Sequence, residues 1–366
     1  MQQAIAATLM RGGTSKGLYL DARDLPQDDS TRDAVLLALM GSPDARQIDG
    51  LGGAHPLTSK IAILSPPSRP DADIDYLFLQ VSVDQAQVSD GQNCGNILAG
   101  VGPWAIESGL VAAQQSPTDA AGTTPVRVHM LNTGGMAIAS VPVVNGQVCY
   151  SGDAQIDGVP GTAAGIELNF LELAGSTCGT LLPTGNSIDI VDGLELTCID
   201  NGMPVVLLRA ADLGCSGYET PAELEADLEL KARIEKIRLA LGERMNLGDV
   251  SDRTVPKMCL LAPPRDGGVV CTRMFIPHRV HEAIGVLAAV SVATACAMGD
   301  TVADAVAAAS DHNQLAVEHP SGYFTVAMEI EGRGATCKIH KSALLRTARK
   351  LFAGDVFLPP GIWSQS

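Results

Sequence analysis

The chain has few aromatic residues and too little basic charge to balance its acids. Phe, Trp and Tyr make up only 4% of the 366 residues, whereas there are 38 glycines, which favours close packing of backbones. Lysine and arginine total 25 against 41 aspartates and glutamates, so the net charge is -16. Nucleic acids and anionic membrane surfaces bind basic faces, and this charge argues against both as partners. An anionic small molecule therefore requires a local basic pocket.

The sequence also lacks paired cysteines, a leader and a membrane span. Its nine cysteines are scattered, with no CxxC pair and no zinc-ligand spacing, which is typical of a reducing compartment. No apolar leader follows Met1, and the longest apolar run, 284–298, is too short to span a bilayer. We therefore expect a soluble, cytoplasmic protein without a metal site. The oligomeric state stays open, and a homodimer is compatible with the sequence.

An internal repeat divides the chain. Lys60 opens an apolar strand in the first half, and Lys257 opens the matching strand in the second half. The small-residue helix expected after Cys94 aligns without gaps with the stretch that begins at His281. Such a unit is too long for a solenoid and predicts two similar domains. The repeat places these domains at 1–184 and 185–340, and it leaves the tail, 341–366, free to pack back on the first.

We expect both central helices to point their N-termini at the gap between the two domains. The helix dipoles, both strand-opening lysines and further basic residues would give this gap a positive potential, which suits an anionic ligand. The further basic residues are Arg11, Lys16 and Arg273. A duplication without a shared cleft is the alternative.

Cys94 lies in a polar turn just before the first central helix. Free N–H groups in the first turn and the positive end of the helix dipole stabilise a thiolate, which predicts a reactive cysteine. Gly95 lets a ligand carboxylate approach closely, and Asn93 and Asn96 place polar groups beside it. A buried packing cysteine is the plainer alternative.

Lys60 follows Thr58 and Ser59 and opens a strand expected to be buried. A lysine held against apolar surface near other cations has a lowered pKa and can act as a base at neutral pH. Because the approach through Ser59 is polar and Cys94 offers a partner, we interpret Lys60 as a base rather than as a solvated strand-end lysine. We expect an electrostatic role for Lys257, whose half of the repeat has no matching thiol.

The turn from Arg11 to Gly17 carries basic and hydroxyl side chains between glycines. It fails the P-loop pattern, because that pattern requires Gly-Lys-Ser/Thr and here Leu18 follows Gly17. A turn of this kind can still bind a carboxylate through N–H groups and side chains. The candidate contacts are Arg11, Thr14, Ser15 and Lys16. A hairpin turn with solvated charges is the alternative.

Two histidines in the second half, His278 and His281, are three residues apart. No further metal ligand stands at a suitable spacing nearby, so we expect one to orient the substrate and the other to be structural. Ser321, together with His319, lies at a turn that matches Thr133 in the first half, and it can likewise line the site.

Several motifs together resemble the PrpF family over nearly the whole chain. They are Arg11–Gly17, Leu57–Lys60, Asn93–Asn96, Val255–Lys257 and His319–Gly322. The resemblance implies an α+β fold like that of diaminopimelate epimerase, in which two pseudo-symmetric domains each wrap a curved β-sheet or barrel around a central α-helix. It also implies that Lys60 and Cys94 are the catalytic pair. Unlike two-cysteine epimerases, this chain has no cysteine at the start of the second helix.

Members of this family isomerise unsaturated di- and tricarboxylates without a cofactor. The segments Met40–Gly50 and Asp249–Ser251 are most similar to the branch that acts on 4-oxalomesaconate in aromatic and lignin breakdown. The resemblance implies an allylic or keto-enol proton shift, with Lys60 as base and Cys94 as acid or as the group that holds the intermediate. Isomerisation of 2-methylaconitate or 3-methylitaconate stays open, as does a non-catalytic tricarboxylate-binding protein.

Overall fold

The computed structural model describes residues 2–91, 93–114, 121–277, 279–310 and 314–363. The chain divides into two compact units, Met1–Asn169 with Leu345–Ser366, and Phe170–Leu344. The first division lies before the 184/185 boundary that the repeat suggested. The reason is that the segment after β9 (Gly165–Leu171) bonds to the second unit, because the N–H groups of Thr177 and Cys178 donate to Asp200 Oδ2 (2.8 and 2.7 Å), and the repeat carried no signal for these contacts.

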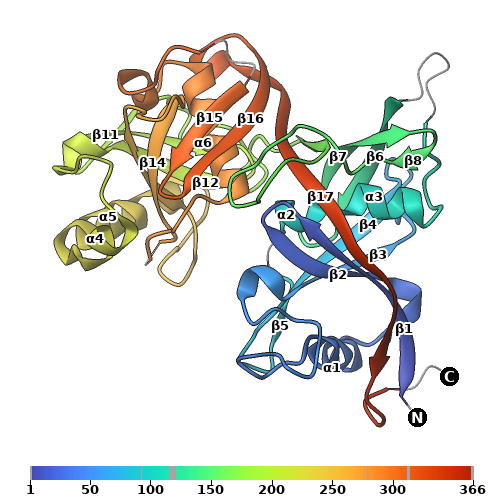
Figure 1. The fold of residues 1–366 in the computed structure, drawn as a ribbon. Coiled ribbons are helices and arrows are strands. Elements are labelled where there is room, and N and C mark those ends of the chain that lie inside the picture. Colours follow the sequence, from blue (N-terminus) through green and yellow to red (C-terminus); the bar gives the residue numbers. More distant parts are fainter. Residues whose placement is uncertain (1, 92, 115–120, 278, 311–313, 364–366) are drawn as a thin grey trace. The chain divides into compact units, whose positions relative to one another are not determined.

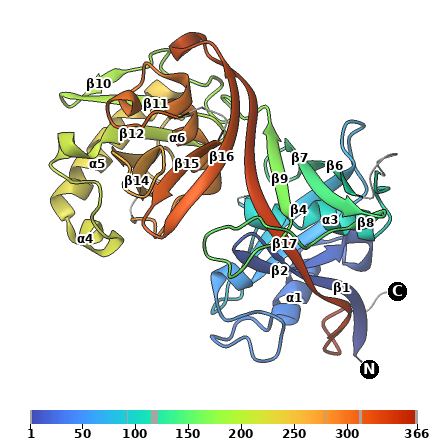
Figure 2. The ribbon, with the colours of Figure 1, turned by 45° about the horizontal axis from the view of Figure 1, so that its top comes forward.

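The sheet of the first unit closes on itself. Its strands pair in the order β1, β2, β3, β4, β6, β7, β9 and β17, and β17 pairs back with β1. Figure 2 shows β9 between β7 and β17. From β1 to β7 the pairings alternate between antiparallel and parallel. The bounds are β1 (Gln3–Gly12), β2 (Ser15–Asp21), β3 (Lys60–Ser65), β4 (Ile74–Val81), β5 (Val88–Ser89), β6 (Ala121–Met130), β7 (Gly135–Val144), β8 (Gln147–Val148) and β17 (Lys338–Leu358).

The two faces of this sheet pack against different helices. Ile61 and Ile63 belong to the cluster that packs with α1 (Asp29–Met40) on the outer face. Successive residues of a strand point to opposite faces, so Lys60 lies on the inner face. That face carries α2 (Gly95–Leu98) and α3 (Val101–Glu107). The sequence therefore directs the side chain of Lys60 to the side on which the central helix lies.

The second unit repeats this order of strand pairing. From β11 to β16 the pairings alternate as they do from β1 to β7. Figure 1 shows α6 (Val286–Met298) inside the curve of this sheet, against β12, β15 and β16. On the outer face lie α4 (Pro221–Ala226) and α5 (Leu228–Leu241). The strands are β10 (Asp189–Val191), β11 (Leu194–Asp200), β12 (Pro204–Arg209), β13 (Lys257–Ala262), β14 (Val270–Phe275), β15 (Gln314–His319) and β16 (Gly322–Glu331).

This architecture confirms the predicted α+β fold, with a curved sheet around central helices in each of two similar units. The repeat keeps its register at the strands that the two lysines open. Lys60 lies opposite Gly17 in a parallel pair, and Lys257 lies opposite Val205 in the matching parallel pair. The two lysines therefore occupy equivalent positions in their own sheets.

The predicted start of the second central helix at His281 is wrong. Gly285 is the N-cap of α6, so Gly285 rather than His281 matches Cys94, the N-cap of α2. His281 Nδ1 accepts from the N–H of Ala283 (2.9 Å), and the His281 N–H donates to the Met274 carbonyl (2.8 Å). This local turn uses the backbone N–H groups of His281 and Ala283, so these groups are not available for a helix that starts at His281.

Candidate active site

Cys94 is the N-cap of α2 in the first unit, and it is half-buried. Its thiol makes no capping hydrogen bond to the helix. Gly95 is the first helical residue, and the N–H groups of a first helical turn have no partner within the helix. The structure therefore places this thiol at a helix start, as the sequence predicted.

Two buried tyrosines hold the backbone around Cys94. Tyr76 OH donates to the Cys94 carbonyl (3.2 Å), and Tyr19 OH donates to the Ile97 carbonyl (2.5 Å). Burial, and after it the negative charge of Cys94, raises the pKa of both tyrosines, so both remain protonated donors at neutral pH. The sequence analysis missed both, because each lies within an apolar strand and gives no separate signal.

The predicted carboxylate-binding turn packs against the start of α2. Gly13 has a φ of +51°, and a Cβ at this position would lie 2.1 Å from Asn96 Oδ1. Asn96 Nδ2 donates to Thr14 Oγ1 (3.1 Å), and Lys16 of the same turn is half-buried. The β1–β2 turn and the helix that Cys94 caps therefore form one wall.

Several side chains of this wall carry buried polar atoms that have no hydrogen-bond partner in the described structure. They are Ser15 Oγ, Asn93 Oδ1 and Asn96 Oδ1. Buried polar atoms are normally paired, so each is a candidate ligand contact. A hydroxyl can donate to a carboxylate, and an amide oxygen can accept from an enol hydroxyl. Asn93 is held in place because its Nδ2 donates to Thr133 Oγ1 (2.7 Å).

Lys60 is buried, with 6% of its surface exposed. Its Nζ donates to Gln80 Oε1 (2.6 Å) and lies 5.0 Å from the centre of the Phe78 ring. Gln80 Nε2 in turn donates to the carbonyls of Pro56 and Ser59, both at 3.0 Å, so its oxygen faces the lysine. Within the described residues Lys60 forms no ion pair with a carboxylate, and neutral groups hold this amine.

Lys60 and α2 meet at Gly17. A Cβ on Gly17 would lie 2.5 Å from the Lys60 carbonyl oxygen and 3.2 Å from Ile97 Cδ1. No side chain larger than hydrogen fits there without displacing β3 or α2. Gly17 therefore allows the strand of Lys60 and the helix of Cys94 to pack closely.

The β6–β7 turn joins β4, which pairs with the strand of Lys60, to Asn93, which precedes the N-cap of α2. Asn132 Oδ1 accepts from the Phe78 N–H, and Asn132 Nδ2 donates to the Phe78 carbonyl, both at 2.8 Å. The next residue, Thr133, accepts from Asn93. Because Phe78 lies next to the amine and Asn93 precedes the thiol, the predicted base and thiol share one side of the first unit.

Two of the predicted substrate contacts, Arg11 and Ser59, bond to other groups of the first unit. Arg11 Nη1 donates to the carbonyls of Gly13 (2.8 Å) and Thr347 (3.0 Å), which ties the β1–β2 turn to β17. Ser59 is fully buried, and its hydroxyl donates to Gln47 Oε1 (2.7 Å). These contacts favour positioning roles for Arg11 and Ser59.

Arg346 is a candidate that the sequence analysis missed. It is 4% exposed and lies in β17, in the part of that strand that belongs to the first unit. Burial lowers the pKa of its guanidinium, and the negative charge of Cys94 opposes this shift, so the two groups interact. A guanidinium at this place adds positive charge for a thiolate or a carboxylate. Because Arg346 and Cys94 are far apart along the chain, no sequence pattern connected them.

Lys257, His281 and Ser321 form a second cluster, within the second unit. Burial, and after it the charge of Arg238, lowers the pKa of Lys257 to about 8. Burial, and after it the charge of Lys257, lowers the pKa of His281, so these two side chains interact. Ser321 Oγ donates to the carbonyl of Glu282 (3.0 Å), next to His281. The structure thus brings together three residues that the sequence singled out separately.

Arg273 lies apart from this cluster. It shares the outer face of β14 with Cys271 and Phe275, which pack with α4 and α5. Its Nε donates to the Glu219 carbonyl (2.6 Å), just before α4. This placement argues against the predicted contact of Arg273 with the substrate. The alternation of residues along β14, which puts Arg273 on the same face as Cys271 and Phe275, already indicates this. The other predicted residue of this region, His278, lies outside the described residues.

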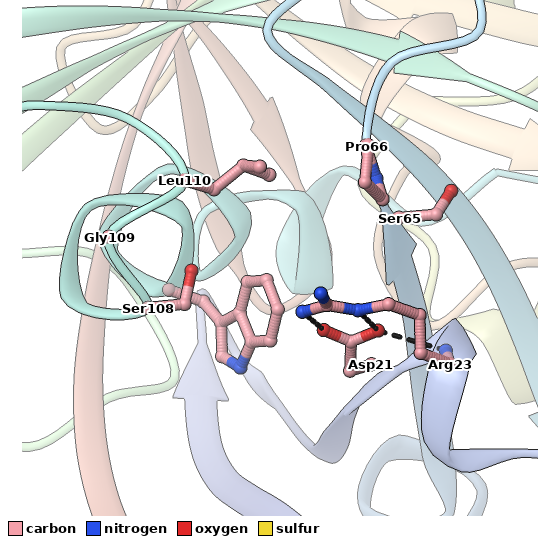
Figure 3. Close-up of a pocket in the computed structure, with 8 residues that line it drawn as sticks. Asp21, Arg23, Ser65, Pro66, Ser108, Gly109 and Leu110 are labelled. Carbon is pink, nitrogen blue, oxygen red and sulfur yellow. Dashed lines mark hydrogen bonds and ion pairs between the residues drawn. The ribbon is translucent and has the colours of Figure 1, made fainter.

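A surface pocket of the first unit lies between Trp104 and Arg23 (Figure 3). Arg23 binds Asp21 through Nε (3.0 Å) and Nη2 (2.6 Å), so its charge is already paired. The pocket contains neither the predicted base nor the thiol. Across the described ranges, no group of His, Cys, Asp and Glu side chains is arranged to hold a metal ion. No helix in that part of the chain is long and apolar enough to cross a membrane.

Residues 2–359 match the family model described as PrpF protein. The chain belongs to the PrpF family. A 4-oxalomesaconate tautomerase of Pseudomonas putida is 60% identical to it over 364 residues, which cover 99% of this chain and 98% of the relative. A (4E)-oxalomesaconate Delta-isomerase of Novosphingobium sp. is 58% identical over 351 residues, which cover 95% and 96%.

A solved structure has the same fold as this chain. The crystal structure of methylitaconate-delta-isomerase matches this PrpF chain with a TM-score of 0.88 at 34% identity, and it covers 100% of this chain and 99% of that one. The relatives in both comparisons are isomerases, and this PrpF chain is an isomerase as well.

Proposed function

We propose that this chain is a cofactor-independent isomerase that moves a proton within an unsaturated tricarboxylate such as 4-oxalomesaconate. The observation that carries the proposal is the placement of Lys60, held by neutral groups, on the same side of the first unit as the thiol of Cys94. The substrate class is supported by the two relatives at 60% and 58% identity. We propose a cytoplasmic location and a role in the breakdown of aromatic compounds.

Lys60 acts as the base. In its neutral form the amine takes a proton from a carbon next to a double bond and a carbonyl group. Gln80 and the Phe78 ring fix the position of Nζ without supplying a negative charge that would hold it as an ammonium. The fold therefore places the base through contacts with neutral groups.

The dienolate that forms carries negative charge, which preorganised donors stabilise. The donors of the first unit are the N–H groups at the start of α2, the Ser15 hydroxyl and Arg346. Cys94, in its thiol form, gives its proton to the other allylic carbon, and the thiolate that remains recovers a proton from the Lys60 ammonium as the cycle closes. The side chains of Thr14, Lys16, Asn93 and Asn96 orient the substrate, and Gly95 leaves space for a carboxylate.

Within the second unit, a cluster of side chains can bind a carboxylate. Lys257 supplies an ammonium, His281 lies beside it, and Ser321 adds a hydroxyl. Because burial makes charge interactions stronger than in water, a half-buried ammonium is an effective carboxylate partner. We leave Arg273 out of this contact, since its guanidinium faces α4.

A second candidate is the isomerisation of a smaller methyl-substituted dicarboxylate by the same residues. The match to the methylitaconate-delta-isomerase structure favours it. This reaction differs in substrate and product but uses the same base and thiol, so only a direct comparison of substrates separates the two.

The test is proton NMR in deuterated water with 4-oxalomesaconate and, separately, with 3-methylitaconate. We expect deuterium to enter an allylic carbon of 4-oxalomesaconate while the double bond moves. Both Lys60→Ala and Cys94→Ala should lose this exchange, whereas Cys149→Ala, which removes another half-buried thiol of the first unit, should keep it.

Each outcome decides something different. Deuterium exchange with 3-methylitaconate alone would keep Lys60 and Cys94 as the catalytic pair and would make 3-methylitaconate, rather than 4-oxalomesaconate, the substrate. Tight binding of both compounds without exchange would replace the isomerase proposal by a tricarboxylate-binding protein. Full activity of Lys60→Ala would remove Lys60 from the mechanism.

A further inference from the structure

Arg238 on α5 is a buried charge that the proposed chemistry does not use. None of its surface is exposed. Its Nε and Nη2 donate to the two oxygens of Glu235, both at 2.7 Å. The Glu235 side chain is 28% exposed whereas Arg238 is not exposed at all, and one ion pair seldom offsets the cost of burying a charge, so stability alone does not explain an arginine here.

The remaining nitrogen of Arg238 holds the segment that leads to Lys257. Nη1 donates to the carbonyls of Val250 (2.9 Å), Arg253 (3.3 Å) and Val255 (2.9 Å). Lys257, which opens β13, follows two residues after the last of these carbonyls. One guanidinium therefore fixes the whole loop 250–255 immediately before the lysine.

The first unit has an equivalent anchor in front of Lys60. Gln47 is 1% exposed, and its Oε1 accepts from the Ala54 N–H (2.8 Å) and from Ser59 Oγ (2.7 Å). Ser59 directly precedes Lys60. In both units, one buried polar side chain from earlier in the chain holds the loop before the strand-opening lysine. Gln47 follows α1 in a loop whereas Arg238 lies within α5, but each holds the loop before the lysine, which indicates that the anchors serve to place these lysines.

Arg238 also acts on the charge of Lys257. After burial, its positive charge is the second cause that lowers the pKa of this lysine. His281, from the segment after β14, is the other titratable group that interacts with Lys257 among the described residues, and Glu282 acts on His281 in turn. Arg238 is thus linked to Lys257 both through the backbone and through space.

We propose that Arg238 is a positioning residue for Lys257, which it sets by anchoring loop 250–255 and by its positive charge. The inference rests on the proposed function, in which Lys257 contacts a substrate carboxylate, and it names the residue through which that contact is controlled. Since only the protonated lysine attracts a carboxylate, KM rises as the pH passes about 8.

The experiment measures kcat and KM for 4-oxalomesaconate from about pH 6 to pH 10, with circular dichroism as a check of folding. The variants are Lys257→Met, Arg238→Lys, Glu235→Gln and, as a control on the same helix, Arg233→Lys. Arg233 Nε donates to Asp192 Oδ2 (3.4 Å), and no hydrogen bond joins Arg233 to loop 250–255 among the described residues. Glu235→Gln loosens the guanidinium without removing it, and it is the variant to use if Arg238→Lys does not fold.

We expect Lys257→Met to raise KM about tenfold near neutral pH and to abolish the alkaline rise. Arg238→Lys keeps a positive charge but loses the carbonyl contacts, so KM should rise several-fold with kcat nearly unchanged. Glu235→Gln should act in the same direction and more weakly. Arg233→Lys should match the wild type.

A folded Arg238→Lys or Glu235→Gln variant with the KM and pH profile of the wild type would overturn the inference and leave Arg238 with a structural role. Wild-type KM in Lys257→Met would overturn both the inference and the proposed contact at Lys257. The isomerase proposal itself is tested by Lys60→Ala, which should lose deuterium exchange, whereas the Arg238 variants should keep it.

Discussion

Lys60 Nζ donates to the amide oxygen of Gln80 over 2.6 Å, and the amide is turned towards it by the carbonyls of Pro56 and Ser59. A carboxylate in this place would hold the lysine as an ammonium, which cannot accept a proton. A neutral amide fixes the same geometry without that effect. The pairing therefore defines the position of the amine through a neutral group.

The Gln80→Glu variant tests this relationship. The new carboxylate favours the ammonium form of Lys60, so kcat at neutral pH should fall by roughly tenfold or more, and part of the loss should be recovered at alkaline pH. A profile of kcat against pH is the measurement. Gln80→Met, which removes the acceptor without adding charge, should lower kcat without moving the profile. Identical profiles for Gln80→Glu and wild type would show that Gln80 does not control the base.

Comparing Gly13→Ala with Gly109→Ala should distinguish the effect of the close contact between Gly13 and Asn96 from the effect of backbone strain alone. Gly13 has a φ of +51°, and its new Cβ would lie 2.1 Å from Asn96 Oδ1. Gly109, with a φ of +78°, has nothing within 4 Å of such a Cβ. Both variants carry a backbone cost of about 1 kcal/mol, but only Gly13→Ala displaces the start of α2. We expect a thermal melt to show a larger loss for Gly13→Ala, together with lower kcat/KM; equal losses of stability and activity would contradict the close packing.

Thr133→Val removes the acceptor that holds Asn93. The bond from Asn93 Nδ2 to Thr133 Oγ1 is 2.7 Å, and Thr133 is exposed, so the effect on stability should stay below about 1 kcal/mol. Freed from this contact, the amide beside Cys94 no longer orients the substrate, and KM should rise several-fold. Thr133→Ser restores the hydroxyl and should restore KM. Steady-state kinetics of both variants test this role of Asn93. An unchanged KM in Thr133→Val would exclude Asn93 as a substrate contact.

Lys257→Met should stabilise the protein at neutral pH. The pKa of Lys257 is about 8 in the folded chain, against about 10.4 for an unfolded lysine. Between these values the unfolded state binds more protons, so the stability of the wild type rises with pH. The gain from Lys257→Met should therefore be largest below about pH 8, on the order of 1 kcal/mol for a partly exposed group, and should vanish near pH 10. Urea unfolding at several pH values measures it; a gain independent of pH would contradict the buried charge.

The sequence determined the features that depend on local pattern. A continuous apolar run placed Lys60 at the start of a buried strand, and a small-residue run after a polar turn placed Cys94 at a helix start. The recurrence of a strand-opening lysine at Lys257 predicted two similar units, and the resemblance to the PrpF family implied their α+β architecture. Each of these depends on neighbouring residues along the chain, where periodicity reports directly on which face is buried.

Only the tertiary structure decided which groups meet these residues. Gln80, Arg346 and Arg238 act on Lys60, Cys94 and Lys257 from distant parts of the chain, and no spacing along the sequence records such contacts. The helix start at Gly285 was likewise missed, because the turn at His281 uses backbone groups that a gapless alignment assumes to be free. Local periodicity specifies the faces of strands and helices, whereas the pairing of distant side chains is set by how the closed sheet brings those faces together.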